Sequence, residues 1–129
     1  MQNPDTDRPI AEEEWTTMDY EHAVMQLIAS SGEARSLSLK AARTARKGQL
    51  AEAEELLRQA KDSLTQAHKV QTKLIQAEGR GEKTEVTLLL IHAQDHLMNA
   101  LTVRELIVEL IEEIKQRLTL EQQWKGSVN

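Results

Sequence analysis

Three long stretches of the chain repeat apolar residues at spacings of three and four, which is the period of one face of an α-helix. The pattern predicts helices over about residues 18–46, 50–78 and 84–120. Because only short joints separate them, neighbouring helices must run antiparallel, so the chain is predicted to be all-α, an up-down-up three-helix bundle. The clearest repeat, in the second stretch, misses one position at Gln71 and consists of Leu50, Ala53, Leu57, Ala60, Leu64, Ala67 and Leu74.

Glycines and prolines set the boundaries of these helices. Lys47-Gly48 forms the first joint and Gly79-Arg80-Gly81 the second, and a glycine directly after a helical run is typical of a helix end. Both prolines lie before residue 10, within a polar and charged segment. We therefore predict a disordered lead-in over residues 1–16, a folded domain over residues 17–120 and a frayed tail over residues 121–129.

The third predicted helix is apolar over an arc of roughly 220°, where a helix on the surface of a monomer needs little more than about 100°. Part of this arc keeps a heptad register, which is typical of helices that pack against copies of themselves. The width favours contact between third helices of different subunits, and a well-packed monomer core is the alternative explanation. The residues in this register are Leu89, Ala93, His96, Ala100, Val103, Ile107, Leu110 and Ile114.

Composition narrows the class of protein. The 129 residues are enough for one domain, and aromatic residues make up only 2%, which favours helices over sheets. Cysteine is absent, which excludes disulfides and thiolate metal sites, and the net charge of −5 disfavours nucleic-acid binding. Residues 1–14 lack the features of a signal peptide, and the longest apolar run, residues 88–91, is too short to span a membrane. We therefore expect a cytoplasmic protein.

The candidate chemistry lies in the segment His92-Ala-Gln-Asp95-His96 of the third predicted helix. His92 and His96 are four residues apart and share a helix face, and Asp95 reaches the rim of that face. The segment fits structural histidines, a zinc site with His-x-x-x-His spacing, or a phosphoryl carrier. The zinc hypothesis lacks the glutamate base of zinc proteases, since Ala93 follows His92. The carrier hypothesis uses the nucleophilicity of a neutral imidazole near neutral pH.

Three segments of the sequence decide between these hypotheses. They are Ser31-Gly-Glu-Ala-Arg-Ser-Leu37, Ala67-His-Lys-Val-Gln-Thr-Lys-Leu-Ile75 and, above all, Leu89-Leu-Ile-His-Ala-Gln-Asp-His-Leu-Met98. With these segments the chain resembles the IIA component of the lactose/cellobiose-type branch of the bacterial sugar phosphotransferase system. The resemblance covers about residues 18–118.

The resemblance implies a phosphotransferase component that assembles as a homotrimer through its third helix. It implies that His92 accepts a phosphoryl group from the phosphocarrier protein HPr. His92 would pass that group to a cysteine of a IIB component, which serves a membrane IIC transporter. It also implies that Asp95 from each of three subunits holds a single Mg²⁺, and oxygen ligands suit such a hard cation. The sequence does not specify the sugar within the lactose, cellobiose and chitobiose types.

Other residues and other functions stay open. His96 is predicted to support His92 or the subunit interface, and Gln94 is predicted to be structural. His68 and Gln71 are predicted to be structural residues that bond across helices, and no role at the site is assigned to them. The alternative functions are a histidine phosphotransfer domain of bacterial signalling and a structural coiled-coil adaptor. The first alternative usually places a lysine close to its histidine, and the third predicted helix has none near His92.

Overall fold

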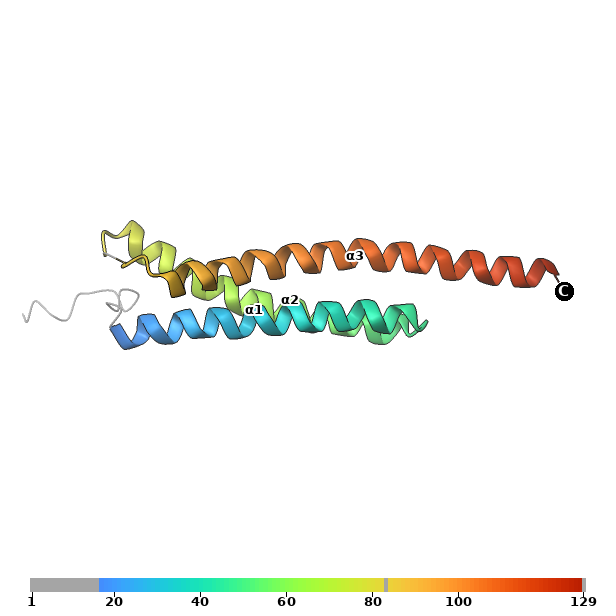
Figure 1. Cartoon of the computed structure of the whole chain (residues 1–129), viewed down its shortest axis with the longest axis horizontal. Coiled ribbons are helices and arrows are strands. Elements are labelled where there is room, and N and C mark those ends of the chain that lie inside the picture. The colour runs from blue at the N-terminus through green and yellow to red at the C-terminus, as the bar shows by residue number, and fades with distance from the viewer. Residues whose placement is uncertain (1–16, 83, 129) are drawn as a thin grey trace, which may run out of the picture.

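The computed structural model describes residues 17–82 and 84–128, and all its regular structure is helical. The helices are α1 (Thr17–Arg46), α2 (Leu50–Gly79) and α3 (Leu88–Val128). Figure 1 shows that each helix runs antiparallel to the one before it along one long axis, which is the up-down-up order that the apolar periodicity predicts. The predicted lead-in lies outside the described residues.

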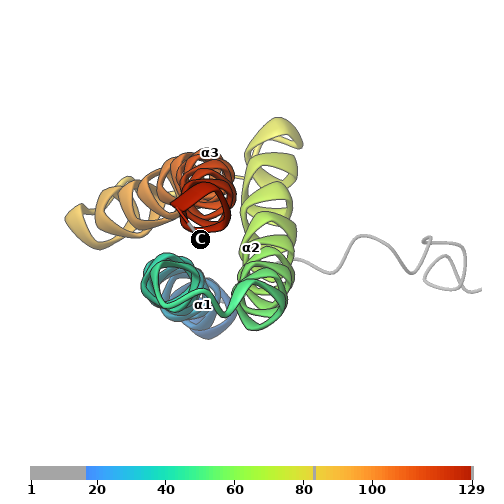
Figure 2. The ribbon, with the colours of Figure 1, turned by 90° about the vertical axis from the view of Figure 1, so that its right-hand side faces the viewer.

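The helix α1 contacts both other helices extensively, whereas α2 and α3 contact each other much less. Viewed along the long axis, α3 lies above α1, while α2 stands beside both of them and is inclined to α3 (Figure 2). None of the described helices has the length and hydropathy that a membrane crossing needs.

Glycines end the first two helices, as the joints predict. The φ angle is 82° at Gly48 and 84° at Gly81, a region that only glycine enters without steric cost. At the first joint the amide of Gly48 donates to the carbonyl of Ala45 at 2.9 Å. The amide of Gln49 donates to the carbonyl of Thr44 at 3.3 Å. These bonds satisfy carbonyls that the end of α1 would otherwise leave without a partner.

The helix α3 begins later than the sequence analysis predicts, at Leu88 and not near Thr84. Thr87 explains the difference, because its hydroxyl accepts a hydrogen bond from the Leu90 amide at 3.1 Å. A threonine in this position is an N-cap, which satisfies an amide at the first turn. The segment before it is held by α1, since the Tyr20 hydroxyl donates to the Glu85 carbonyl at 2.9 Å. Burial raises the pKa of Tyr20.

The helix α3 also ends later than predicted, because it continues past Leu120 to Val128. The prediction of a helix end near Leu120 is therefore wrong. Residues 121–125 contain no glycine or proline, and glutamate, glutamine and lysine among them favour the helical state. As a result α3 has 41 residues, against 30 in α1 and 30 in α2, and its last turns extend beyond the joint between α1 and α2 (Figure 1).

Two clusters of buried side chains form the core. One lies at the end of the bundle where α3 begins, and we call it the site-end core. The other lies toward the first joint, and we call it the turn-end core. The site-end core consists of Ala23, Val24, Leu27, Ala34, Leu64, Ala67, Val70, Leu74, Ala93, Leu97 and Ala100. The turn-end core consists of Ala41, Ala42, Ala45, Ala53, Leu56, Leu57, Ile107, Ile111 and Ile114.

The heptad residues that the sequence analysis assigns to a subunit interface lie partly inside the monomer. Ala93, Ala100, Ile107 and Ile114 are buried in the two cores of the same chain. The alternative explanation, a monomer core, is therefore correct for these residues. A different apolar row of α3 remains exposed, which we call the outer stripe; it consists of Leu88, Ile91 and Met98, which are 83%, 56% and 53% exposed.

Two polar contacts join α3 to α2, which otherwise pack against each other much less than either packs against α1. The Arg104 guanidinium donates from Nε to the Leu57 carbonyl at 3.1 Å. The Lys115 ammonium donates to Glu54 at 2.8 Å, and this hydrogen bond raises the pKa of Lys115. These contacts link α3 to α2 and supplement the apolar packing that buries one face of α3.

Candidate functional site: a histidine pair on the outer face of α3

His92 and His96 lie one helical turn apart on α3, as their spacing predicts, and their side chains touch. The two Nε2 atoms are 3.1 Å apart, and the ring centroids are 4.5 Å apart with the planes at 85° to each other. A distance of 3.1 Å between two ring nitrogens is a hydrogen bond, which requires one donor and one acceptor. The structure therefore couples the predicted nucleophile to the predicted supporting histidine.

The hydrogen bond between the rings requires one of the two facing nitrogens to donate and the other to accept. With both imidazoles neutral, one ring donates its Nε2 proton and the other accepts it. With both rings protonated, two N–H donors would face each other and the contact would break. The pair is therefore suited to a state in which at least one of the rings offers a nitrogen lone pair.

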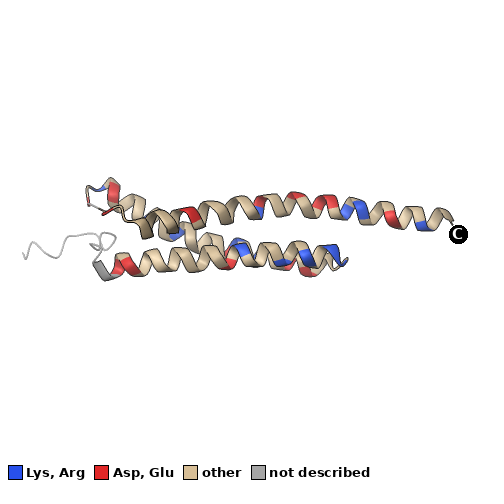
Figure 3. Ribbon diagram, viewed as in Figure 1, with Lys and Arg blue, Asp and Glu red and all other residues tan. Residues whose placement is uncertain are grey.

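The side chain of His92 is exposed, and that of His96 is half-buried. The surface around them is apolar, because Leu88 and Ile91 of the outer stripe and the neighbouring Leu89 are also exposed. Asp95 is the only Lys, Arg, Asp or Glu between Leu88 and Val103, and Figure 3 shows the scarcity of charge along this part of α3. An exposed apolar surface with a few polar groups is typical of a place where a protein partner binds.

Asp95 is exposed on α3 and makes no hydrogen bond or ion pair with another described residue. The structure therefore does not bring it into contact with the histidine pair, although it lies on the same outer side of the helix. Within the described part of one chain, no group of three or more His, Asp and Glu side chains could hold a metal ion. A metal ligand set that includes Asp95 would therefore need ligands beyond the described residues of one chain.

Gln71 bonds across helices, as the sequence analysis predicts, and the structure identifies its partner as Gln94. The Gln71 side-chain amide donates to the Gln94 side-chain oxygen at 2.7 Å, which links α2 to the segment that carries His92. The missed position in the apolar repeat of α2 was a signal for this contact, because a polar residue on a buried face needs a polar partner. Gln94 is structural, as predicted, and acts together with Gln71.

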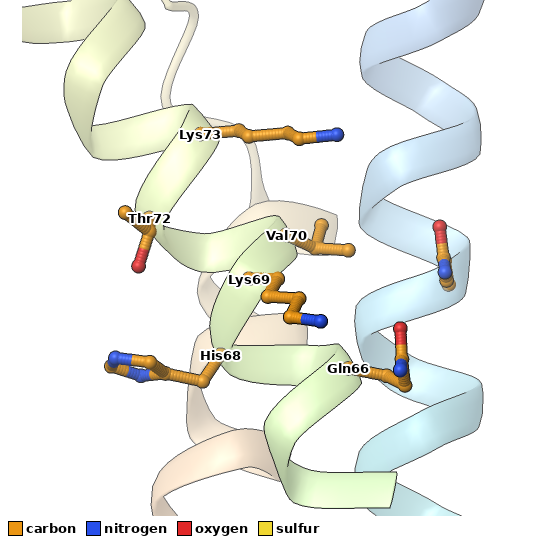
Figure 4. A pocket seen from close by; sticks show the side chains of 7 residues that line it. Gln66, His68, Lys69, Val70, Thr72 and Lys73 are labelled. Atoms are coloured by element: carbon orange, nitrogen blue, oxygen red, sulfur yellow. The ribbon is translucent and has the colours of Figure 1, made fainter.

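His68 lies on α2, away from the histidine pair in the chain, and its side chain is exposed. It lines a shallow hollow of about 370 Å³ beside α1, together with Gln66, Lys69, Val70, Thr72, Lys73 and Gln26. In Figure 4 the His68 ring points away from α1, while the side chains of Lys69 and Lys73 extend toward it. The hollow contains none of the predicted site residues.

Comparison with known proteins places this histidine pair in a family context. Residues 22–115 match the family described as the lactose/cellobiose-specific IIA subunit of the phosphotransferase system. The chain belongs to this family. The matched residues include most of all three helices and both histidines, so this IIA subunit is a component of a phosphotransferase system.

Individual relatives agree with the family match. The lichenan-specific phosphotransferase enzyme IIA component of Bacillus subtilis is 47% identical over 94 residues, which are 73% of this chain and 86% of that protein. The crystal structure of the cellobiose-specific enzyme IIA from Bacillus anthracis superposes with a TM-score of 0.76 at 49% identity, covering 82% of this chain and 95% of that one. The three-helix fold is thus that of a solved IIA protein.

A solved complex adds information about partners. A solution structure of the IIA(chitobiose)–HPr complex of the Escherichia coli phosphotransferase system has a TM-score of 0.65 at 44% identity. It covers 81% of this chain and 97% of that chain. In that complex a IIA protein of the same family and fold is bound to HPr.

Proposed function

We propose that this IIA subunit is a cytoplasmic phosphoryl carrier in the uptake of a cellobiose- or chitobiose-type sugar. His92 accepts the phosphoryl group from HPr and passes it to a cysteine of a IIB component that serves a IIC transporter. The observation that carries the proposal is the exposed His92 imidazole, hydrogen-bonded to His96 on an apolar surface of a chain of this family. The IIA–HPr complex of a relative supports HPr as the donor.

The transfer to His92 needs a nitrogen lone pair directed at the phosphorus of phosphorylated HPr. A P–N bond to His92 forms while the bond between phosphorus and the HPr group breaks, and the departing group takes up a proton. Phosphoryl transfer depends mainly on positioning and on stabilising charge, because its transition state is loose. The exposed side chain of His92 allows a partner to approach in line, and the apolar rim around it excludes water once the partner binds.

His96 acts on His92 as a positioning residue. Its Nε2, 3.1 Å from the Nε2 of His92, restricts the rotation of the exposed ring and shares a proton with it. A ring held in one orientation loses less entropy when the partner binds. The half-buried position of His96 in turn limits its own movement.

The outer stripe is the surface through which we propose that three subunits assemble. Leu88, Ile91 and Met98 are more than half exposed in the monomer, and with Asp95 they follow a spacing of three and four along α3. That spacing forms a coiled-coil seam when copies of the helix pack in parallel. Burying these side chains between copies would remove apolar area from water, which favours association.

Asp95 is the residue of this seam that would hold a metal. In a symmetric trimer three Asp95 carboxylates would face one another at the axis, and their mutual repulsion would oppose assembly. One Mg²⁺ bound by carboxylate oxygens would neutralise that charge and join the subunits. Asp95 fits this role because its carboxylate is exposed and not engaged by another described residue.

Phosphoryl acceptance is tested by incubating the protein with HPr, its upstream kinase and labelled phosphoenolpyruvate. We expect the wild type to be labelled and His92→Gln to lose all labelling while its circular dichroism stays unchanged. His22→Gln is the matched control, because His22 is also exposed but lies on α1, and it should be labelled normally. Labelling that survives in His92→Gln and disappears in His96→Gln would mean that His96, and not His92, is the acceptor.

Assembly and metal binding are tested on the same protein. Sedimentation equilibrium should give about three times the 14.6 kDa of one chain, and elemental analysis should find one Mg²⁺ per three chains. Asp95→Asn should lose the metal and keep the histidine labelling. A wild type without bound metal, or a trimer whose metal content is unaffected by Asp95→Asn, would contradict the role of Asp95.

A further inference from the structure

The two imidazole rings on α3 place two nitrogens at the spacing of neighbouring ligands around one metal ion. The Nε2 atoms of His92 and His96 are 3.1 Å apart, and the ring planes are at 85° to each other. A Zn²⁺ ion binds histidine nitrogens at about 2.0–2.1 Å, so two of them lie about 3.3–3.4 Å apart in a tetrahedral site. At right angles, as in square-planar Cu²⁺ and Ni²⁺ sites, the same bond lengths give about 2.8–3.0 Å. The observed distance lies between these values, so a small rotation of the side chains fits either geometry.

The neutral pair can offer both nitrogens to a cation without a net loss of protons. A neutral imidazole carries one proton, which can reside on Nδ1 or on Nε2. In the hydrogen-bonded pair one ring carries its proton on Nε2 and donates it to the Nε2 of the other ring. When that proton moves to Nδ1 of the same ring, both Nε2 lone pairs face the space between the rings. A cation placed there replaces one hydrogen bond with two metal–nitrogen bonds.

The histidine pair is open to a hydrated cation from solution. The side chain of His92 is exposed and that of His96 is half-buried, so water can occupy the coordination positions that the protein leaves free. No third His, Asp or Glu of the described residues lies close enough to join the pair, and this includes Asp95. A site with two protein ligands and bound water exchanges its metal readily, unlike a structural site that is closed by four protein ligands. The arrangement therefore suits reversible binding.

The chemistry of the ligands selects the class of metal. Imidazole nitrogen suits Zn²⁺, Ni²⁺ and Cu²⁺, whereas Mg²⁺ takes oxygen ligands. The histidine pair therefore differs in its ligand chemistry from the Mg²⁺ site that we propose at Asp95. Ala93 follows His92 where a zinc protease has its glutamate base, so a metal at this pair lacks the group that would activate a bound water. Metal binding here would block the nucleophile and add no hydrolytic chemistry.

We propose that His92 and His96 together bind one divalent transition-metal cation of the Zn²⁺, Ni²⁺ and Cu²⁺ class, and that this cation reversibly inhibits the phosphoryl carrier. The inhibitory part rests on the proposed function of His92. The bound cation occupies the Nε2 lone pair of His92 and holds its ring against His96, so the ring is not available to phosphorylated HPr. Because the metal and the phosphoryl group compete for one side chain, each lowers the affinity of the protein for the other.

Calorimetric titration of the full-length protein with Ni²⁺ tests the site without any partner protein. We expect one Ni²⁺ per chain. His96→Gln should weaken binding by about tenfold or more, since the loss of even an outer-shell partner of a metal ligand costs about 10–100-fold in affinity. His22→Gln is the matched control, because His22 is an exposed histidine on α1, and it should bind Ni²⁺ as the wild type does. A wild type that binds no Ni²⁺, or equal affinity in the wild type and His96→Gln, would overturn the proposal.

Two further measurements locate the metal. Paramagnetic Ni²⁺ should broaden the NMR signals of the His92 and His96 rings first, while those of His22 and His68 stay sharp. Asp95→Asn should keep the Ni²⁺ affinity of the wild type, because the carboxylate is not among the ligands of the pair. Broadening centred on His22 or His68, or loss of Ni²⁺ binding in Asp95→Asn, would place the cation elsewhere and refute the histidine pair as its site.

The inhibition is tested on the transfer step alone, with HPr that has been phosphorylated and purified beforehand. At a Ni²⁺ concentration about ten times the dissociation constant, only about a tenth of the wild type is metal-free, so transfer should slow about tenfold. A chelator that prefers transition metals to Mg²⁺ should restore the rate. His96→Gln controls for metal bound to HPr: its transfer should have nearly the same rate with and without Ni²⁺. Equal slowing of the wild type and His96→Gln would contradict inhibition through the pair.

Calorimetry and transfer together separate this inference from the carrier function. A wild type that binds Ni²⁺ at the pair and transfers phosphate at an unchanged rate overturns the inhibition and leaves the carrier function intact. A wild type that accepts no phosphate even without metal contradicts the proposed function. In that case calorimetry still decides whether His92 and His96 form a metal site.

Discussion

The inner and outer faces of α3 near its first turns differ in almost every physical property. On the inner face Ala93, Leu97 and Ala100 are completely buried against the rest of the bundle. On the outer face His92 and Asp95 are exposed, although each is a close neighbour of a buried residue in the sequence. The comparison teaches that stability and chemistry are assigned to different sides of the same helix.

The separation has a physical cause. The inner face must fill the space between helices, so alanines allow close approach and Leu97 fills the remaining volume. The outer face fills no space between the helices of the monomer. It is nevertheless rich in Leu and Ile, and it carries two histidines that are hydrogen-bonded to each other. A surface of that composition is explained by binding to other proteins and not by folding.

The largest expected effect on stability comes from the inner face. Leu97→Ala should lower the free energy of unfolding by about 2–5 kcal/mol, because it removes buried methyl groups and leaves a cavity. Ile75→Ala is the matched control, since Ile75 is 59% exposed on α2, and it should change stability by no more than about 0.5 kcal/mol. Urea unfolding followed by circular dichroism measures both. Equal losses in the two variants would mean that the burial of Leu97 contributes nothing to stability.

The next effect belongs to the outer face and acts on rate. His96→Ala should slow phosphorylation of His92 by about 10–100-fold, which corresponds to the loss of a hydrogen bond to a group that becomes charged. Its unfolding free energy should stay close to that of the wild type. Rapid-quench labelling with HPr gives the rate. An unchanged rate would remove His96 from the site.

The smallest effect lies away from both faces, on the exposed side of α2. Hydrogen bonds from Arg58 lower the pKa of Glu55 to about 2. A lowered pKa in the folded state means that this contribution to stability is present above the ordinary pKa of about 4.5 and is lost as the pH falls toward 2. NMR titration of the Glu55 carboxyl should show its pKa rise toward 4.5 in Arg58→Gln. Phosphorylation at neutral pH should not change, and a measurable change would couple this exposed ion pair to the site.

Much of the fold could be predicted because it depends on local patterns. The apolar period of α2 and the glycines at both joints identified the three helices and their antiparallel order. The start of α3 was missed, because a threonine becomes an N-cap only when the chain before it leaves the helical path. Gln71 was predicted to bond across helices, but its partner Gln94 was not identified, since no local pattern relates two residues on different helices.

The sequence by itself determined the helices, the family and the pair of histidines one turn apart, because each depends on residues that are close together in the chain. Only the tertiary structure decided which side of α3 faces outward. The predicted interface register proved to be buried at Ala93 and Ile107, and the exposed row near the histidine pair is the outer stripe. The physical reason is that α3 is apolar around most of its circumference, so the side that α1 and α2 cover depends on how the three helices pack together.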